Sequence, residues 1–481
     1  MHTSDIHLSR LPRTADLVVV GGGTAGIVAA KTAAGFGAKV VLIERDRTGG
    51  DCLWTGCVPS KALIAAASAA ATARRGHALG VDVDGVSVDF ARVMKHVHGA
   101  IETIEPVDSP KALTDAGVVV VDGSAVFTGA RTLSVGDRTL TFGRAIVTTG
   151  ARAATPPIQG LDRVEYLTSE SLWELTELPA RLCVLGGGNI GCELSQAFAR
   201  LGSQVTVVES ASSVLSHGDP DAARVLTESM TADGVDVRTS ASATSVEPGI
   251  VVLDDGTRIE FDRLLVATGR SPRTDSLGLD VAGVELDDRG FVVVDDTLRT
   301  SNPHVWAAGD LTAKSSFTHT AGMHGSIAAT NAVLGVRRAI DTSGAPHVTF
   351  TDPEIAVVGV DTVSAGRTDG LHVRTLAHDE VDRPIAEGRT AGFTKLVIDG
   401  KHRIVGALVV GPRAGETLGE LALAVKQGMR TRDLAGVTHP YPTYNDAPWN
   451  AAIADVRGQL AAPVVKYPIR ALAKVRATLT R

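Results

Sequence analysis

The stretch LVVVGGGTAG, residues 17–26, decides the fold that we expect of this chain. Its four leading apolar residues suit a strand that is buried on both faces, and they run directly into a glycine-rich turn. Gly21 would form the tight turn, Gly23 would let a pyrophosphate approach the backbone, and Gly26 would let a helix pack closely against the strand. The stretch therefore predicts the first strand, turn and helix of a dinucleotide-binding unit.

A second apolar run follows this predicted helix and completes the pattern. Residues 40–43 read VVLI, and the next residue is Glu44. A carboxylate at the end of this strand is placed to accept a hydrogen bond from a ribose hydroxyl of the nucleotide. Two strands, a helix and this acid are together far more specific than three spaced glycines, so we interpret residues 17–44 as a complete βαβ unit.

The same pattern occurs again in the middle of the chain. In both copies the acid follows the first glycine by 23 residues. Because a chain with two such units binds two dinucleotides, we expect FAD in the first unit and a nicotinamide dinucleotide in the second. The second unit consists of apolar runs at residues 182–185 and 204–208 together with Gly186, Gly188, Gly191 and Glu209.

The acid of the second unit favours NADH over NADPH. Glu209 would accept a hydrogen bond from the ribose 2′-hydroxyl and would repel a 2′-phosphate. Residues 210–213 read SASS and offer no arginine that could bind such a phosphate. Alternatively, Glu209 merely ends a strand, which would weaken this preference and leave the nicotinamide site itself intact.

Two cysteines lie close together soon after the first unit. Residues 49–61 read GGDCLWTGCVPSK, which places Cys52 and Cys57 five positions apart between glycines. A disulfide in so short a loop is limited by geometry more than by chain entropy, which favours redox chemistry over structural stabilisation. A buried structural pair is the alternative for any such spacing, and the nucleotide-binding units upstream favour the redox pair.

Composition and charge agree with an enzyme. A chain of 481 residues has room for about three domains. The net charge of −7 leaves no basic footprint for a nucleic acid or an anionic membrane. The apolar stretches are shorter than the roughly 18 residues that a membrane span needs, and residues 1–15 contain no apolar signal core. The sparse cysteines are unlike those of a secreted disulfide scaffold, so we expect a soluble cytoplasmic protein.

On these residues, the chain resembles the flavin-dependent pyridine nucleotide–disulfide oxidoreductases, the class I family of glutathione reductase, dihydrolipoamide dehydrogenase and mercuric reductase. The likeness extends from about Ala15 to about Asp455 and includes ATGR at residues 267–270 and TSNPHVWAAGD at residues 300–310. The segments QAFARLGSQVTV, residues 196–207, and TFTDP, residues 349–353, are similar to the mercuric reductase branch.

The resemblance implies an α/β architecture with two Rossmann-like dinucleotide-binding domains and a C-terminal α+β dimerisation domain. It implies an FAD domain with its central segment at residues 1–152 and 272–345, an NAD(P) domain at 153–271, and a dimerisation domain with a basic tail at 346–481. The expected assembly is a homodimer whose active site is shared between subunits. Further implied cofactor-binding positions are Gly150, Gly269 and Arg270, Asp310 at the ribityl chain, and the backbone near Thr318 at the pyrimidine edge of the flavin.

The resemblance also implies a route for electrons. A hydride passes from NADH to flavin N5, and an electron pair then passes to the Cys52–Cys57 disulfide and on to a small electrophilic acceptor. Cys57 is implied as the thiol next to the flavin and Cys52 as the thiol that meets the substrate. Lys61 is expected near flavin N5, paired with Glu193, because a buried lysine without a carboxylate would tend to lose its charge. The alternative for Lys61 and Glu193 is a pair of unrelated surface charges.

Three positions depart from the pattern of the disulfide reductases. Asn189 stands where several relatives have a tyrosine that covers the nicotinamide site, so we expect that site to be more open. In HPYPTYND, residues 439–446, Tyr441 stands at the position of the catalytic histidine and Asp446 at that of the glutamate. Mercuric reductase also has a tyrosine there. His439, two residues early, is a weaker candidate for handling protons.

The tyrosine bears on the acceptor. Protonating a thiolate of pKa about 8.5 from a tyrosine of pKa about 10 is uphill by roughly 2 kcal/mol. Tyr441 therefore favours an acceptor that needs little proton transfer, such as a soft metal ion, a quinone or a disulfide with a stabilised leaving thiolate. Mercuric reductase itself carries a cysteine pair near its C-terminus, whereas the last cysteine here is Cys192.

Apart from the acceptor, we predict no site for a resident metal ion.

Two other functions stay open from the sequence. One is a diaphorase that reduces quinones directly from flavin, and the other is a redox-sensing flavoprotein whose cysteine state controls a partner. The complete nicotinamide site favours an enzyme. Trp54, between the cysteines, either shapes the substrate pocket or packs structurally. The tail at residues 464–481 carries only positive charges and is predicted as a solvated helix or, alternatively, as a contact with a partner or a membrane.

Overall fold

The computed structural model describes residues 11–314, 316–341 and 344–479. The described residues divide into two compact units. Of these described residues, those in 11–73, 85–210 and 238–340 form the first unit, and those in 74–84, 211–237 and 341–479 form the second.

The first unit is built around a sheet with β1 (Thr14–Val20) near its centre. The strands are ordered β3-β2-β1-β6-β5-β4, and β16 pairs with β6. β1 is parallel to both β2 and β6. Leu17, Val18 and Val19 are each 0% exposed, as a strand buried on both faces requires. The other strands are β2 (Val40–Glu44), β3 (Val118–Asp122), β4 (Ala125–Gly129), β5 (Thr132–Val135), β6 (Arg138–Val147) and β16 (Val305–Ala307).

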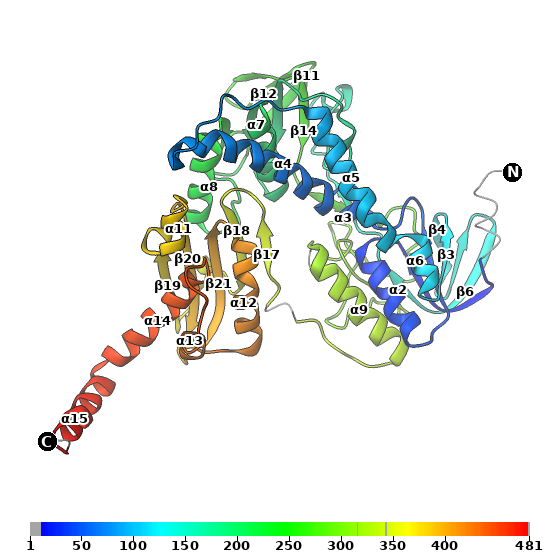
Figure 1. The fold of residues 1–481 in the computed structure, drawn as a ribbon. Helices are drawn as coiled ribbons and strands as arrows, with labels where there is room; N and C mark the ends of the chain where they lie inside the picture. The colour runs from blue at the N-terminus through cyan, green and yellow to red at the C-terminus, as the bar shows by residue number, and fades with distance from the viewer. Residues whose placement is uncertain (1–10, 315, 342–343, 480–481) are drawn as a thin grey trace. The chain divides into compact units, whose positions relative to one another are not determined.

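Two helices with many small residues pack side by side on one face of this sheet. They are α2 (Thr24–Gly35) and α9 (Thr318–Leu334), which share a core with β1 and β2 (Figure 1). A Cβ atom added at Gly325 of α9 would lie 2.2 Å from the carbonyl oxygen of Ala25, so the two backbones are in direct contact. The segment between β2 and β3 adds α3 (Gly50–Trp54), α4 (Cys57–Arg75), α5 (Phe90–Asp108) and α6 (Pro110–Asp115). It also contains η1 (Gly76–Leu79), which belongs to the second unit.

A second βαβ arrangement follows in the same unit. It consists of β8 (Arg181–Leu185), α7 (Asn189–Leu201) and β9 (Gln204–Val208), and β8 is parallel to both β9 and β14. A small antiparallel sheet, β11-β12-β13, shares its core. The remaining elements are β7 (Ala151–Ala153), η2 (Leu161–Arg163), η3 (Leu172–Glu174), β11 (Ala243–Glu247), β12 (Ile250–Leu253), β13 (Arg258–Glu260), β14 (Arg263–Val266) and β15 (Arg270–Pro272).

The second unit contains an antiparallel sheet ordered β17-β18-β21-β20-β19. Its core is closed by α12 and α14, whose buried residues include Leu418, Leu421 and Ala451. The elements are β17 (His347–Thr349), β18 (Glu354–Gly359), α10 (Thr362–Ala365), β19 (Leu371–Ala377), η4 (His378–Glu380), α11 (Asp382–Ala386), β20 (Phe393–Asp399), β21 (Ile404–Gly411), α12 (Ala414–Gln427), α13 (Thr431–Ala435), α14 (Asp446–Ala461) and α15 (Pro463–Leu479).

Helix α8 (Pro220–Ala232) belongs to the second unit. Lys395 Nζ of β20 lies 2.8 Å from an oxygen of Asp219, the N-cap residue of α8, and Ser229 donates a hydrogen bond to the carbonyl oxygen of Asp352. The sequence placed residues 211–237 inside the nicotinamide domain. These contacts explain the different grouping, and the predicted domain boundaries stay predictions.

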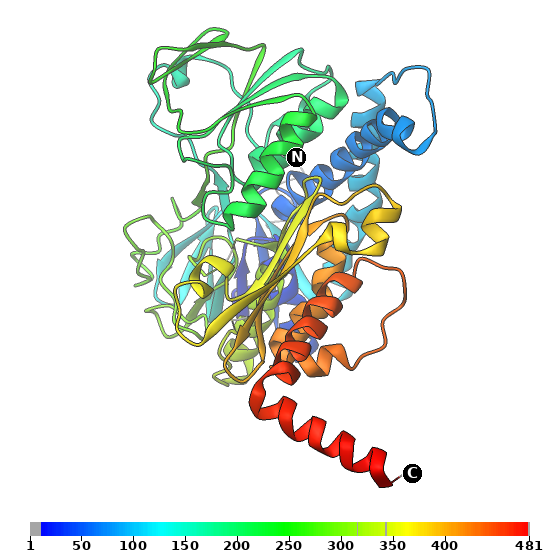
Figure 2. The same ribbon diagram turned by 90° about the vertical axis from the view of Figure 1, so that its left-hand side faces the viewer.

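Helix α15 is unusual in the second unit because none of its described residues is buried. It continues from the end of α14, in red in Figure 2. Val464, Leu472 and Leu479 are between 64% and 80% exposed. The helical part of the tail prediction is confirmed up to Leu479, and residues 480 and 481 lie outside the described residues. Within the described part of the chain, no helix is long and apolar enough to cross a membrane.

Candidate active site

The two glycine turns have the same geometry. Gly21 and Gly186 adopt φ values of +105° and +108°, which favour glycine. A Cβ atom at Gly26 would lie 1.9 Å from the carbonyl oxygen of Gly21, and one at Gly191 would lie 1.9 Å from that of Gly186. Each third glycine therefore allows its helix to touch the preceding turn, which is the role that the sequence assigned to it.

The two acids also occupy equivalent places. Glu44 Oε2 accepts a hydrogen bond of 2.5 Å from the backbone N–H of Gly22, and Glu209 Oε2 accepts one of 2.6 Å from that of Gly187. Each carboxylate thus lies at the end of its second strand and beside its glycine turn. This is the position from which a carboxylate can reach a ribose hydroxyl.

The helix ends next to these turns fit two dinucleotides. Gly23 and Gly188 are the N-cap residues of α2 and α7, no side chain caps either helix, and neither has an acidic residue in its first turn. A Cβ atom at Gly188 would meet nothing within 4 Å, and at Gly23 the nearest atom is 3.9 Å away. Backbone N–H groups and a positive helix end therefore face open space, as a pyrophosphate requires.

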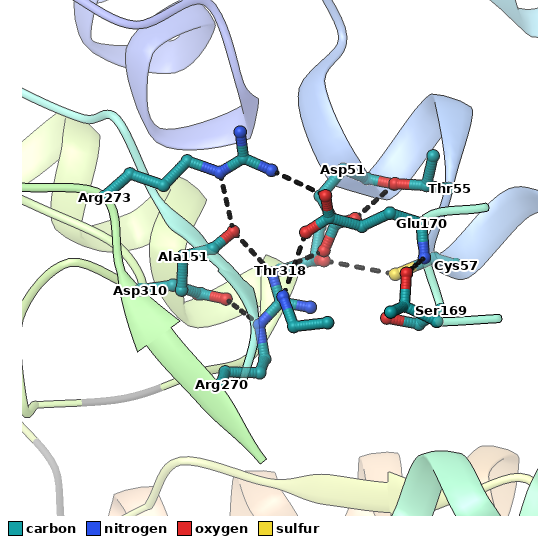
Figure 3. Close-up of polar contacts among 12 residues, drawn as sticks. Asp51, Thr55, Cys57, Ala151, Ser169, Glu170, Arg270, Arg273, Asp310 and Thr318 are labelled. Atoms are coloured by element: carbon teal, nitrogen blue, oxygen red, sulfur yellow. Dashed lines mark hydrogen bonds and ion pairs between the residues drawn. The ribbon is translucent and has the colours of Figure 1, made fainter. Parts of the chain in front are cut away.

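An ion-pair network lies beside the first nucleotide unit (Figure 3). The Arg270 guanidinium is 2.7 Å from Asp51 and 3.5 Å from Asp310, and it donates a hydrogen bond of 3.1 Å to the carbonyl oxygen of Ala151. Burial raises the pKa of Asp310. Burial alone would lower the pKa of Arg270, but the two carboxylates more than offset this and raise it.

The sequence assigned Arg270 and Asp310 to cofactor binding and gave Asp51 no role. The structure brings all three side chains together. The available signal was the position of Asp51, directly before Cys52. Gly150 and Gly269, the other predicted cofactor positions, have φ values of +70° and +140° and flank the paired strands β7 and β15.

The two cysteines lie next to each other on different helices. Cys52 belongs to the short helix α3, whereas Cys57 is the first residue of α4. Both are free thiols, half-buried and hydrogen-bonded to each other, which is the reduced state of the pair. The Thr318 hydroxyl lies 3.1 Å from Cys57 Sγ, and the Thr24 hydroxyl is hydrogen-bonded to Cys52.

The surroundings make the two thiols unequal. The pKa of Cys57 is lowered to about 6, first by the hydrogen bond from Cys52, against the effect of burial, and further by Thr318 and the charge of Lys61. The pKa of Cys52 is raised, because it donates that hydrogen bond and is buried beside the Cys57 thiolate. The amino end of α4 also favours a thiolate at Cys57. The reduced pair therefore holds its thiolate at Cys57 and its proton at Cys52.

Lys61 and Glu193 are brought together as the sequence expected. Lys61 Nζ lies 2.9 Å from Glu193 Oε2, and the glutamate side chain is only 9% exposed. Lys61 is one helical turn after Cys57 on α4, so both side chains lie on the same face of that helix. This contact excludes the alternative that Lys61 and Glu193 are two unrelated surface charges. The role of the pair beside a flavin stays a prediction.

The C-terminal candidates lie in the second unit, whereas the cysteines lie in the first. Tyr441 is 72% exposed and donates a hydrogen bond to Asp382, which raises the pKa of its hydroxyl. Asp446 is 4% exposed and accepts a hydrogen bond of 2.9 Å from the N–H of Thr443. The hydroxyl of Tyr441 is thus hydrogen-bonded to Asp382, whereas the carboxylate of Asp446 holds the backbone of Thr443.

The weaker candidate, His439, is held in a structural role. Its side chain is 4% exposed, lies 2.7 Å from Glu420 and packs on the ring of Trp449 at a centroid distance of 5.5 Å. Trp54 is also anchored: its indole N–H donates to the carbonyl oxygen of Thr48 at 2.7 Å, and Arg47 covers its ring. These contacts favour packing as the role of Trp54.

Two hydroxyl groups were missed by sequence reasoning. The sequence proposed the backbone near Thr318 as a flavin contact, whereas the structure places the Thr318 side chain at Cys57. Thr24, inside the first glycine turn, was given no role and contacts Cys52. Asn189 is the first residue of α7, and the expectation that it leaves the nicotinamide site more open stays a prediction.

Comparison with known proteins defines the class. The family model "Pyridine nucleotide-disulphide oxidoreductase" matches residues 15–325, and the model of the family's dimerisation domain matches residues 345–452. The mercuric reductase of Bacillus cereus is 36% identical over 438 residues, which cover 89% of this chain and 69% of that protein. The dihydrolipoyl dehydrogenase of Chlamydia pneumoniae is 33% identical over 439 residues, covering 90% of this chain and 95% of that one.

A solved structure shows the same fold. The HOCl-induced flavoprotein disulfide reductase RclA of Escherichia coli matches with a TM-score of 0.81 at 28% identity, covering 90% of this chain and 98% of that chain. RclA has also been solved as a Cu(II) complex.

The fold and the site therefore define a flavin-dependent oxidoreductase with two dinucleotide-binding units and a redox cysteine pair. The chain belongs to the pyridine nucleotide–disulphide oxidoreductase family. Its mercuric reductase and dihydrolipoyl dehydrogenase relatives confirm the predicted class I membership, the fold class, and the use of FAD and a pyridine nucleotide. The dimerisation domain indicates a homodimer.

Proposed function

We propose that this enzyme uses NADH to reduce a small electrophilic acceptor through Cys52 and Cys57, with a soft metal ion or a small disulfide as the acceptor class. The observation that carries the proposal is the unequal thiol pair. Cys57, at the head of α4, has a pKa of about 6 because of the Cys52 hydrogen bond, Thr318 and Lys61, while Cys52 keeps the proton.

The first half of the cycle reduces the cysteines. When bound, FAD supplies an electron pair that it receives as a hydride from the nicotinamide. Two electrons break the Cys52–Cys57 sulfur–sulfur bond, and uptake of one proton leaves a thiolate on Cys57 and a thiol on Cys52. Lys61, Thr318 and the amino end of α4 stabilise the negative charge on Cys57. Glu193 keeps the Lys61 side chain in place.

The second half passes the electron pair to the acceptor. With a disulfide, Cys52 loses its proton and attacks one sulfur, a first thiolate leaves, and attack by Cys57 on Cys52 re-forms the intramolecular bond. The released proton and the second thiol fragment leave with the product. With a soft metal ion, Cys52 releases its proton to solvent and both sulfurs bind the ion as thiolates. The two thiolates then give up two electrons, either to one ion or singly to two ions, and the sulfur–sulfur bond re-forms.

Tyr441 favours the metal ion as acceptor. The hydrogen bond to Asp382 raises the pKa of the Tyr441 hydroxyl, so this group is a poor proton donor to a leaving thiolate. A metal ion needs no such proton. Relatives support the same direction, since several are named mercuric reductase and the E. coli relative was solved as a Cu(II) complex. In this proposal, the Tyr441 that acts in a given active site belongs to the partner subunit. We also propose that the enzyme works in the cytoplasm, where NADH is supplied.

The test is NADH oxidation by the flavin-loaded enzyme against mercuric ion, cupric ion, small disulfides and quinones, beside the Cys52→Ala variant. We expect at least one soft metal ion or disulfide to be reduced, and we expect Cys52→Ala to lose about 100-fold or more of that turnover. Reduction of the flavin by NADH in a single turnover is the control and should survive the substitution. Equal turnover by both proteins would mean that acceptors take electrons directly from flavin, as in a diaphorase, and would overturn the proposal.

A further inference from the structure

Three side chains of the second unit converge outside the redox site. His372 lies on β19, His402 lies in the turn between β20 and β21, and Asp455 lies on α14. One potential ligand atom from each lies within 4.8 Å of the others. Residues from three separate elements thus meet at one point, although they are 30 and 53 positions apart in sequence.

The carboxylate is the centre of this group. His372 Nε2 lies 3.1 Å from Asp455 Oδ1, and His402 Nδ1 lies 3.2 Å from Asp455 Oδ2. The imidazole rings are 6.3 Å apart and nearly perpendicular to each other, at 76°. The two imidazoles therefore approach the same carboxylate from different directions, one at each oxygen.

Hydrogen bonds from neighbouring side chains hold the Asp455 carboxylate in place. Thr431 Oγ1 donates to Asp455 Oδ2 at 2.7 Å, and Gln459 Nε2 donates to the same oxygen at 2.8 Å. The Oδ1 atom receives neither bond and contacts only His372 among the described residues. A ligating carboxylate is commonly held in this way by outer hydrogen bonds, which fix its orientation.

Exposure and backbone conformation complete the arrangement. Asp455 is 4% exposed, whereas the side chains of His372 and His402 are 42% and 41% exposed, so solvent reaches the imidazoles but not the carboxylate. His402 adopts a φ of +61°, in the left-handed region that non-glycine residues seldom occupy. Its backbone carbonyl oxygen accepts a bond of 3.0 Å from the N–H of Thr431, which fixes the turn against α13.

We propose that His372, His402 and Asp455 bind one divalent transition-metal ion, with Zn²⁺ as the best match, and that water completes its coordination. Two imidazole nitrogens and one carboxylate oxygen are ligands that Zn²⁺ and its neighbours accept, whereas Ca²⁺ and Mg²⁺ prefer oxygen alone. The bound ion would link β19, the β20–β21 turn and α14. The sequence predicted no metal site, because the three residues match no short spacing motif.

The same contacts would also suit ordinary ion pairs between protonated histidines and Asp455. The two roles differ in what they require, because a metal ion needs both imidazoles neutral and releases protons on binding. A metal site also needs all three ligands, whereas ion pairs lose one contact at a time. Binding of Zn²⁺ to ligand variants therefore separates the two.

The experiment is a calorimetric titration, in which Zn²⁺ alone is added to the full-length, flavin-loaded protein and the heat of binding is measured. Cys52→Ser/Cys57→Ser is the background, so that no redox thiol competes for the ion. We expect one saturable site, and we expect the Kd to rise by at least about tenfold in His372→Gln and in His402→Gln, whose side chains are exposed enough to keep the fold intact.

A matched control is His77→Gln, because His77 also lies 2.6 Å from a carboxylate, that of Asp82, but has no third ligand group beside it among the described residues. Zn²⁺ affinity should be unchanged in this variant. Thermal unfolding gives a second readout: Zn²⁺ should raise the Tm of the background protein and of the control, but not that of His402→Gln. Absence of a saturable site, or equal affinity in all variants, would overturn the proposal.

Discussion

At the scale of single residues, the chemistry depends on which sulfur carries the charge. Cys57 starts α4, accepts a hydrogen bond from Cys52 and lies 3.1 Å from the Thr318 hydroxyl. Because these groups act on the charged form, the Cys57 pKa is lowered to about 6. The thiolate is therefore the main form above this pH, and protonation removes it below.

The hydroxyl of Thr318 can be tested through this pH dependence. In the reduced wild-type enzyme, the long-wavelength thiolate–flavin absorbance band should grow as pH rises, with a midpoint near the Cys57 pKa of about 6. Thr318→Val should move the midpoint up by about one unit, since a hydrogen bond to a charged group contributes ~1.5 kcal/mol. Cys57→Ser, which removes the thiolate, should lack the band. An unmoved midpoint in Thr318→Val would contradict the assignment.

Glu209 is a second residue whose charge has a measurable effect. Glu209→Ala should raise the KM for NADH by about tenfold, because the ribose loses a charged hydrogen-bond acceptor worth ~1.4 kcal/mol. The KM for NADPH should not rise, since the negative charge that repels a 2′-phosphate is also removed. Ser210→Ala is the matched control: Ser210 donates to Glu209 at 3.3 Å but leaves the carboxylate in place. Steady-state kinetics with NADH and with NADPH would show whether Glu209 sets the preference between the two nucleotides.

At the scale of elements, sequence patterns predicted the features that depend on neighbouring residues only, namely the buried strands, the glycine turns and the helices after them. Four apolar residues before Gly21, and again before Gly186, specify a buried strand followed by a turn that only glycine accommodates. The order of helix and strand after each turn follows from the same patterns. The Lys61–Glu193 pair was reached by resemblance to relatives.

Contacts between distant segments could not be predicted in this way. No sequence pattern places Arg270 between Asp51 and Asp310, or the Thr318 side chain at Cys57. Both depend on how α9 and β15 are placed in three dimensions. The grouping of α8 with β20 likewise depends on Lys395 and Asp219, which are 176 residues apart.

Helix α15 illustrates an element whose stability effect can be predicted from its surroundings. None of its described residues is buried, and its apolar side chains, including Val464 and Leu472, face solvent. Removing residues 463–481 should therefore leave the Tm within about 2 °C of the full-length value, because burial of apolar area is what stabilises a helix in a folded protein. Differential scanning calorimetry of both proteins measures this. A drop of about 5 °C or more would show that another surface covers the helix.

At the scale of the whole molecule, the chain is one subunit of a homodimer in a family of flavin-dependent disulfide oxidoreductases. Each cofactor-binding unit and the redox pair belong to one compact unit, whereas Tyr441 and Asp446 belong to the other. The expectation that Tyr441 and Asp446 act in the active site of the partner subunit stays a prediction.

Tyr441 provides the test at this scale. Tyr441→Phe should lower turnover with the preferred acceptor by about tenfold or more, while single-turnover reduction of the flavin by NADH stays unchanged. Tyr467→Phe on the exposed helix α15 is the control, with a side chain that is 68% exposed. If Tyr441→Phe turns over as fast as the wild type, this residue does not reach the substrate.

The contact between α2 and α9 has a mechanical consequence. Gly325 lies seven residues, about two turns, after Thr318 on α9, and its backbone presses on Ala25, in the first turn of α2. A single methyl group at Gly325 would force the two helices apart. Because Thr318 lies on the same helix, we expect its hydroxyl to shift relative to the Cys57 sulfur. On this expectation, the acidity of Cys57 depends in part on the absence of a side chain two turns away.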